Sequence, residues 1–182
     1  PAGDGEVYEI RLASTQADGN DLDVTLDRFA ELAAEMSDGR IQITVYPGNI
    51  LGDELVTTEM CQHNQLEMTM TSAGVLETFC PEFSILTLPA LFEDYDHLIA
   101  ALDSEWGQTL KDSTAAQDMT LLGYTCNGFM NIGTVGTPVS SIEDLNGLTI
   151  RCIESASTLT ILSEWGCNPN PMAFSEVPTS LQ

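Results

Sequence analysis

The feature of the sequence that most constrains its fold is an alternation between two hydrophobic periods. Residues 7–14 read as a strand, and Ile41, Ile43 and Val45 alternate with polar residues as a half-buried strand does. Between them, residues 21–36 place their apolar side chains on one helical stripe and end at Ser37-Asp38-Gly39, a helix stop signal. Strands separated by helices imply βαβ units and a mostly parallel sheet. We therefore predict the α/β class.

The same pattern continues toward the C-terminus. Further strands are predicted at 66–70, 119–124, 130–135 and 148–152, and further helices at 54–63, 95–117 and 156–165. Asp53 and Ser155 stand where a side-chain oxygen can accept from the first free N–H groups of a helix, so each is a predicted N-cap. Near residues 124–130 the βα series gives way to a pair of strands. We expect residues 1–124 to form a first α/β lobe and residues 125–182 to supply hinge strands and the start of a second, incomplete lobe.

Charge excludes one large class of partner. The chain has 28 acidic and 5 basic side chains, for a formal net charge of −23 at pH 7. Proteins that bind phosphate backbones neutralise them with Lys and Arg, so nucleic acid is excluded as a partner. Most of the carboxylates are expected to form a solvated, mutually repelling surface.

Cysteine and histidine give no sign of a metal site or of catalysis. The five cysteines are an odd number and form no CxxC pair, so we expect no metal, at most two disulfides and at least one thiol. Hydrolytic chemistry needs a nucleophile beside a base, yet the only histidines are His63 and His97, and neither GxSxG nor HExxH occurs. We predict that the protein is not an enzyme and uses no cofactor.

Polar residues follow several predicted strands at the point where each strand ends. In open α/β sheets, ligands bind beyond the carboxyl ends of the strands. The residues that fall there are Thr15 and Gln16 after the first strand, Ser72 after the third, Asn127 after 119–124, and Arg151 at the end of LTIR. Arg151 is notable because it is one of only five basic side chains, which predicts a specific task for it.

Short motifs along almost the whole chain identify a family resemblance. They are, in order, SDGRIQITVYP, NILGDE, LEMTMTSAGVL, FCPEF, LTLPALF, LLGYTCNGF, SSIEDLNGLTIR and GCNPNPMAFSEV. In this order and spacing the chain resembles the solute-binding proteins of tripartite ATP-independent periplasmic (TRAP) transporters, of the dicarboxylate-binding type. The resemblance implies a two-lobed, clamshell-like α/β receptor of the periplasmic-binding-protein type II class. It also implies an extracytoplasmic location, in the periplasm or lipid-anchored at the cell surface, and membrane subunits of a TRAP transporter as partners.

The resemblance also implies roles for particular residues in binding a small organic acid. Arg151 matches the arginine that grips the ligand carboxylate in this family, and Phe174 matches the aromatic residue beside it. Asn127 and Ser72 match positions on opposing walls of the pocket. Thr15 and Gln16 match the first βα loop, which supplies polar contacts in several members.

Three departures from the family pattern qualify this expectation. Met130 stands where many members have a second arginine, so a second charge clamp is not expected. Glu154 stands where sialic-acid-binding relatives have asparagine, which favours a monocarboxylate of polar or zwitterionic character over a simple dicarboxylate. The chain also stops at AFSEVPTSLQ, so the second lobe is expected to be truncated, with the remainder removed or disordered, or replaced by association with another chain. The alternative function is therefore a truncated relative that acts only through protein–protein contacts.

Overall fold

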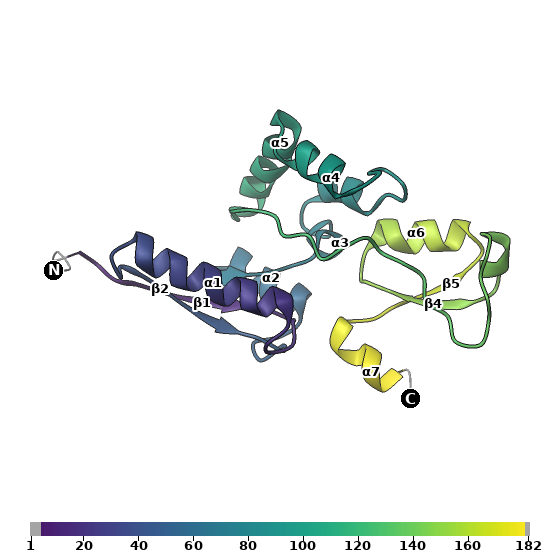
Figure 1. Cartoon of the computed structure of the whole chain (residues 1–182), viewed down its shortest axis with the longest axis horizontal. Helices are drawn as coiled ribbons and strands as arrows, with labels where there is room; N and C mark the ends of the chain where they lie inside the picture. The colour runs from purple at the N-terminus through teal and green to yellow at the C-terminus, as the bar shows by residue number, and fades with distance from the viewer. Residues whose placement is uncertain (1–4, 181–182) are drawn as a thin grey trace. The chain divides into compact units, whose positions relative to one another are not determined.

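The computed structural model describes residues 5–180, which divide into two compact units (Figure 1). The first unit takes in the residues up to Ser72 together with those from Phe174 onward, and the second comprises Ala73–Ala173. The predicted lobe boundary between residues 124 and 125 stays a prediction about the complete fold.

The first unit is built on a parallel three-stranded sheet. Its strands are β1 (Tyr8–Ala13), β2 (Ile41–Tyr46) and β3 (Met68–Thr69), in the order β2-β1-β3. The register of β1 and β2 runs from Tyr8 opposite Ile41 to Ala13 opposite Tyr46. This arrangement confirms the predicted parallel βαβ pattern, although β3 is shorter than the predicted strand at 66–70.

The helices of this unit begin where their capping residues predict. Helix α1 (Asp21–Met36) covers the predicted range and lies alongside β1 and β2 in Figure 1. Helix α2 (Glu54–Gln62) begins after Asp53, whose side chain accepts from the Val56 N–H at 2.9 Å. The unit also includes the 3₁₀ turn η4 (Phe174–Glu176) and helix α7 (Val177–Ser180).

The second unit has a parallel pair of strands, β4 (Thr149–Cys152) and β5 (Asn168–Pro171), joined by α6 (Ala156–Glu164). The Ser155 hydroxyl accepts from the Thr158 N–H at 3.1 Å, which confirms the predicted cap. Strand β5 was not predicted, because its sequence NPNP lacks the β-branched and aromatic residues that favour strands. A small core lies between these elements, formed by Leu145, Cys152, Leu162 and Cys167.

The other regular elements described in the second unit are all helical. They are α3 (Ala73–Leu76), η1 (Pro81–Thr87), α4 (Tyr95–Leu102), α5 (Glu105–Ser113), η2 (Thr114–Gln117) and η3 (Glu143–Leu145). A second core cluster is formed by Leu76, Cys80, Phe83 and Leu110. None of the helices among residues 5–180 is long and apolar enough to cross a membrane.

The single long helix predicted at 95–117 is wrong. The chain breaks between α4 and α5, where Ser104 adopts an extended conformation. Gly107 explains the break, because a Cβ at this position would lie 1.9 Å from the Leu102 carbonyl oxygen. Its backbone therefore approaches the end of α4 more closely than any other residue type would allow, whereas the apolar spacing of 95–117 gives no sign of this corner.

The two strands predicted at 119–124 and 130–135 are also wrong for the described chain. Residues 119–142 contain no regular secondary structure. A strand forms only when a neighbouring strand completes its hydrogen-bond ladder, and the two sheets of the described residues contain no strand from this segment. Several of its apolar side chains are exposed, among them Leu122, Met130 and Val135.

Candidate functional site

In the first unit, two of the predicted site residues lie just after β1 and β3 and donate hydrogen bonds to the carboxylate of Glu54. The Thr15 hydroxyl donates to Oε1 of Glu54 at 3.1 Å. The backbone N–H and the hydroxyl of Ser72 donate to Oε2 of Glu54 at 2.9 and 2.5 Å. Parallel strands end at the same edge of a sheet, which is why residues 15 and 72 meet. The structure thus places a polar, negatively charged cluster where the sequence predicts ligand contacts.

Glu54 itself was missed by the sequence reasoning. It is the first residue of α2, where the unpaired N–H groups and the helix dipole stabilise a negative charge. The available signal was its place in NILGDE, directly after the predicted cap Asp53. Nothing in that motif, however, indicates that Thr15 and Ser72 approach it in space.

Gln16 is held within the loop that joins β1 to α1. Its side-chain oxygen accepts from the Asn20 amide at 2.9 Å, and its carbonyl accepts from the Gly48 N–H at 2.7 Å. These contacts fix the loop beside the Glu54 cluster. Phe174, at the start of η4, is 60% exposed.

In the second unit, Arg151 lies on β4, opposite Asn170 of β5. Its Nε and Nη2 donate to the Met172 carbonyl oxygen at 3.1 and 2.7 Å. This fixes one side of the half-buried guanidinium against the end of β5. Burial raises the pKa of the neighbouring Cys152 thiol, whereas the positive charge of Arg151 lowers it; burial is the larger effect.

The remaining predicted residues differ in how firmly the structure places them. Glu154 is exposed in the short loop between β4 and α6, three residues after Arg151. Asn127 and Met130 are exposed on the segment that lacks regular structure. The fold therefore groups Thr15 and Ser72 around Glu54, and places Arg151 on β4 with Glu154 in the loop that follows, but no strand positions Asn127 or Met130.

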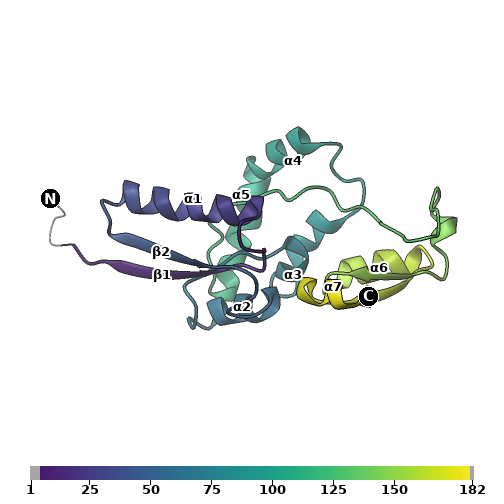
Figure 2. The ribbon, with the colours of Figure 1, turned by 60° about the horizontal axis from the view of Figure 1, so that its bottom comes forward.

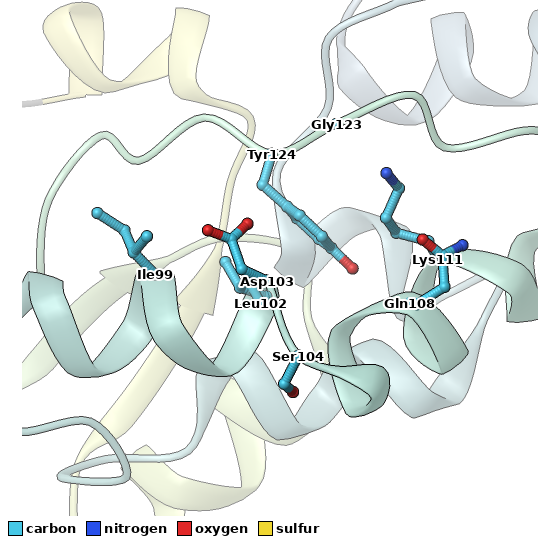
Figure 3. Close-up of a pocket in the computed structure, with 8 residues that line it drawn as sticks. All are labelled: Ile99, Leu102, Asp103, Ser104, Gln108, Lys111, Gly123 and Tyr124. Atoms are coloured by element: carbon cyan, nitrogen blue, oxygen red, sulfur yellow. The ribbon is translucent and has the colours of Figure 1, made fainter.

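A surface cavity of about 300 Å³ lies elsewhere in the second unit, at the corner between α4 and α5 (Figure 3). The Lys111 ammonium donates to the Leu122 carbonyl at 3.1 Å, and the Tyr124 hydroxyl donates to the Gly107 carbonyl at 3.2 Å. None of the predicted site residues lines this cavity. It is therefore separate from the candidate binding residues.

With this geometry in view, comparison with known proteins identifies the family. The family model of the bacterial extracellular solute-binding proteins, family 7, matches residues 12–182. This chain belongs to that family. The resemblance to TRAP solute-binding proteins and the α/β clamshell class are thereby confirmed, because the matching solved structures are receptors of this kind.

Individual relatives show the same relationship. The chain is 32% identical over 173 residues to a solute-binding protein of Verminephrobacter eiseniae, covering 95% of this chain and 52% of the relative. It is 28% identical to the 2,3-diketo-L-gulonate-binding periplasmic protein of Escherichia coli, over 87% of this chain and 48% of the relative. The chain thus spans about half the length of these relatives.

Solved structures agree closely with the fold. A sugar acid binding protein of Advenella mimigardefordensis in complex with galactonate superposes with a TM-score of 0.92 at 28% identity, covering 98% of this chain and 57% of that one. A TRAP periplasmic solute-binding protein of Bradyrhizobium in complex with galacturonate gives a TM-score of 0.91 at 30% identity, covering 96% and 58%.

Proposed function

We propose that this chain carries ligand-binding residues of an extracytoplasmic receptor, which binds a small organic acid in an interlobe cleft and delivers it to a TRAP-type secondary transporter. The observation that carries the proposal is the placement of Arg151 at the carboxyl end of β4, with Nε and Nη2 held by the Met172 carbonyl. A guanidinium oriented in this way can pair with a carboxylate through parallel N–H donors. Membership of a family of solute-binding proteins supports binding without turnover.

The ligand is proposed to be a monocarboxylate that carries several hydroxyl groups. Carboxylate oxygens accept hydrogen bonds from hydroxyls but repel a second carboxylate, and we propose that Glu54 and Glu154 both face the ligand. Met130 offers no charge to a second acid group. Relatives solved with galactonate, galacturonate and D-erythronate show that the family accommodates such acids.

The proposed cycle involves no covalent chemistry. The acid enters an open cleft, Arg151 pairs with its carboxylate and Phe174 packs against its carbon skeleton. Closure of the lobes then excludes water, which strengthens the electrostatic attraction. Binding shifts the equilibrium between open and closed forms, and the membrane subunits respond to that change.

The proposal is tested by thermal shift and calorimetry on the purified protein with D-galactonate, D-galacturonate, D-erythronate and succinate. Galactitol, which has the hydroxyls without the acid, is the neutral control. At least one hydroxylated acid is expected to raise the unfolding temperature more than succinate or galactitol does. Arg151→Ala is expected to weaken its binding by about 2–4 kcal/mol, or roughly 30- to 1,000-fold.

Arg28→Ala, which removes an exposed guanidinium on α1, is the matched control and is expected to leave affinity unchanged. If no acid stabilises the protein, the reading in which it acts only through protein–protein contacts is favoured. If an acid binds equally well to Arg151→Ala, Arg151 is not the clamp.

Because the net charge is −23, the association rate of an anionic ligand is expected to rise with added salt.

A further inference from the structure

A second carboxylate, Glu77, makes a set of contacts that the proposed binding residues leave unexplained. It follows directly after α3 and is only 7% exposed. Its Oε1 accepts from the Ser155 hydroxyl and from the Ser157 N–H, both at 2.9 Å, and its Oε2 accepts from the Ser157 hydroxyl at 2.5 Å. A buried carboxylate is costly unless it is hydrogen-bonded, so these three donors fix its place. Glu77 therefore joins α3 to a loop about 80 residues further along the chain.

The direction of these hydrogen bonds follows from the chemistry of the groups. A carboxylate without a proton only accepts, so the single hydroxyl hydrogen of Ser155 points toward Glu77. The same Ser155 hydroxyl lies 2.9 Å from the Thr158 hydroxyl. The Ser155 oxygen also accepts from the Thr158 N–H at 3.1 Å as the cap of α6. Glu77 thus orients the cap on which the start of α6 depends.

Close packing restrains the same loop next to this network. A Cβ at Gly74, on α3, would lie 2.0 Å from the Cδ1 atom of Ile153, so a larger residue at this position would displace the Ile153 side chain. Figures 1 and 2 both show α3 beside the N-terminal end of α6. Gly74 and Glu77 therefore contact Ile153 and Ser155 in the connection from β4 to α6, and Ser157 in the first turn of α6.

That connection begins at Ile153, separated from Arg151 only by Cys152, the last residue of β4, and it includes Glu154. We infer that Glu77 is a positioning residue for ligand binding, which holds the β4–α6 loop so that Arg151 presents its guanidinium in a fixed direction. The inference rests on the proposed function, in which Arg151 pairs with the ligand's acid group. A loop ordered in advance loses less conformational freedom when ligand binds, which strengthens binding without a new ligand contact.

The first measurement follows the loop without any ligand. In Glu77→Gln the side chain keeps its size but loses its charge, and hydrogen bonds to charged groups are stronger than neutral ones. Hydrogen exchange at the Ser157 N–H and across residues 152–157 is expected to become roughly five to ten times faster. Glu82→Gln removes an exposed carboxylate on η1 and serves as the matched control, with no change expected in the loop. Unchanged exchange in Glu77→Gln would overturn the inference.

The second measurement separates positioning from a general structural role by a double-mutant cycle. The dissociation constant of D-galactonate is measured for the intact protein, Glu77→Gln, Arg151→Lys and the double variant; Lys keeps the charge but not the paired N–H donors. Glu77→Gln is expected to weaken binding about tenfold when Arg151 is present and less than about twofold beside Arg151→Lys. Equal losses in both backgrounds would show that Glu77 acts on the fold in general and would overturn the inference.

The two measurements distinguish the failure of each proposal. If the intact protein binds neither D-galactonate nor any of the other acids, the receptor proposal fails. The exchange rates then still decide whether Glu77 orders the loop. If the protein binds an acid and Ser157→Ala, a milder variant that removes one donor to Glu77, leaves both loop exchange and affinity unchanged, the positioning role fails by itself.

Discussion

Ser72 donates both its backbone N–H and its hydroxyl to Oε2 of Glu54, although 18 residues separate the two in sequence. This double hydrogen bond ties the loop after β3 to the first residue of α2. Thr15, from the end of β1, donates to the other oxygen of the same carboxylate. Three segments of the first unit are therefore joined at a single charged group.

Replacing Glu54 is expected to affect both stability and ligand choice. Glu54→Gln keeps the shape but makes the hydrogen bonds from Thr15 and Ser72 neutral, so the free energy of unfolding is expected to fall by about 1 kcal/mol. Urea denaturation measures the change, and Glu59→Gln, on the exposed side of α2, is the control. In the same variant, affinity for a hydroxylated acid should fall more than affinity for succinate. An equal fall for both would contradict a hydroxyl-binding role.

A surface ion pair gives the first unit a specific response to acid. Nε and Nη2 of Arg11 donate to the two oxygens of Glu67 at 2.8 and 2.6 Å, and these hydrogen bonds lower the pKa of Glu67 to about 2. Because the folded pKa lies below the usual 4.5, the stabilisation is present above pH 4.5 and is lost as the pH falls toward 2. The contribution is expected to be small, since both side chains are exposed.

Urea denaturation of the intact protein and of Glu67→Gln between pH 7 and pH 2 checks this expectation. The difference in unfolding free energy should be constant near neutrality and shrink as Glu67 becomes protonated. Arg11→Gln should remove the same pH-dependent difference, because the guanidinium causes the shift in pKa. A difference that persists at pH 2 would show that the pair is not its source.

Added salt is expected to stabilise this protein. Acidic side chains outnumber basic ones by 28 to 5, so much of the surface charge is of one sign and repels itself. Salt screens this repulsion, with a Debye length that falls from about 30 Å at 0.01 M to about 3 Å at 1 M. The unfolding midpoint in urea should rise as KCl is added. The experiment uses a chloride salt because sulfate stabilises folded proteins in another way, by exclusion from their surface. A midpoint independent of KCl would contradict a dominant role for surface repulsion.

The five cysteines, all of them free thiols, are expected to differ sharply in reactivity. Burial, with a smaller contribution from the charge of Glu67, raises the pKa of Cys61 to about 11, and burial raises the pKa of Cys80, Cys152 and Cys167 as well. Cys126 is exposed. Because the thiolate is the reactive form, iodoacetamide at pH 8 should modify Cys126 first in the native protein and all five thiols in urea. Mass spectrometry counts the modified sites, and rapid labelling that persists in Cys126→Ser would contradict this order.

Local chemistry explains why some elements could be predicted from the sequence. Helix α1 has a continuous apolar stripe and a stop signal, and Asp53 and Ser155 cap α2 and α6 with their own side chains, so each boundary depends on neighbouring residues. The break before α5 was missed because it depends on how closely Gly107 approaches Leu102. The strands predicted at 119–124 and 130–135 were wrong because their apolar residues satisfy only the local pattern, whereas a strand also needs a partner.

The amino-acid sequence by itself determined the α/β class, the family motifs and the candidate clamp Arg151, because periodicity, caps and motif order are all local properties of the chain. Only the tertiary structure decided which groups meet: Glu54 with Thr15 and Ser72, and Glu77 with Ser155 and Ser157. Each of these contacts joins residues at least 18 positions apart. Such pairings follow from strand order and helix packing. The residues next to a glutamate in the sequence do not indicate which hydroxyls will contact its carboxylate in the folded protein.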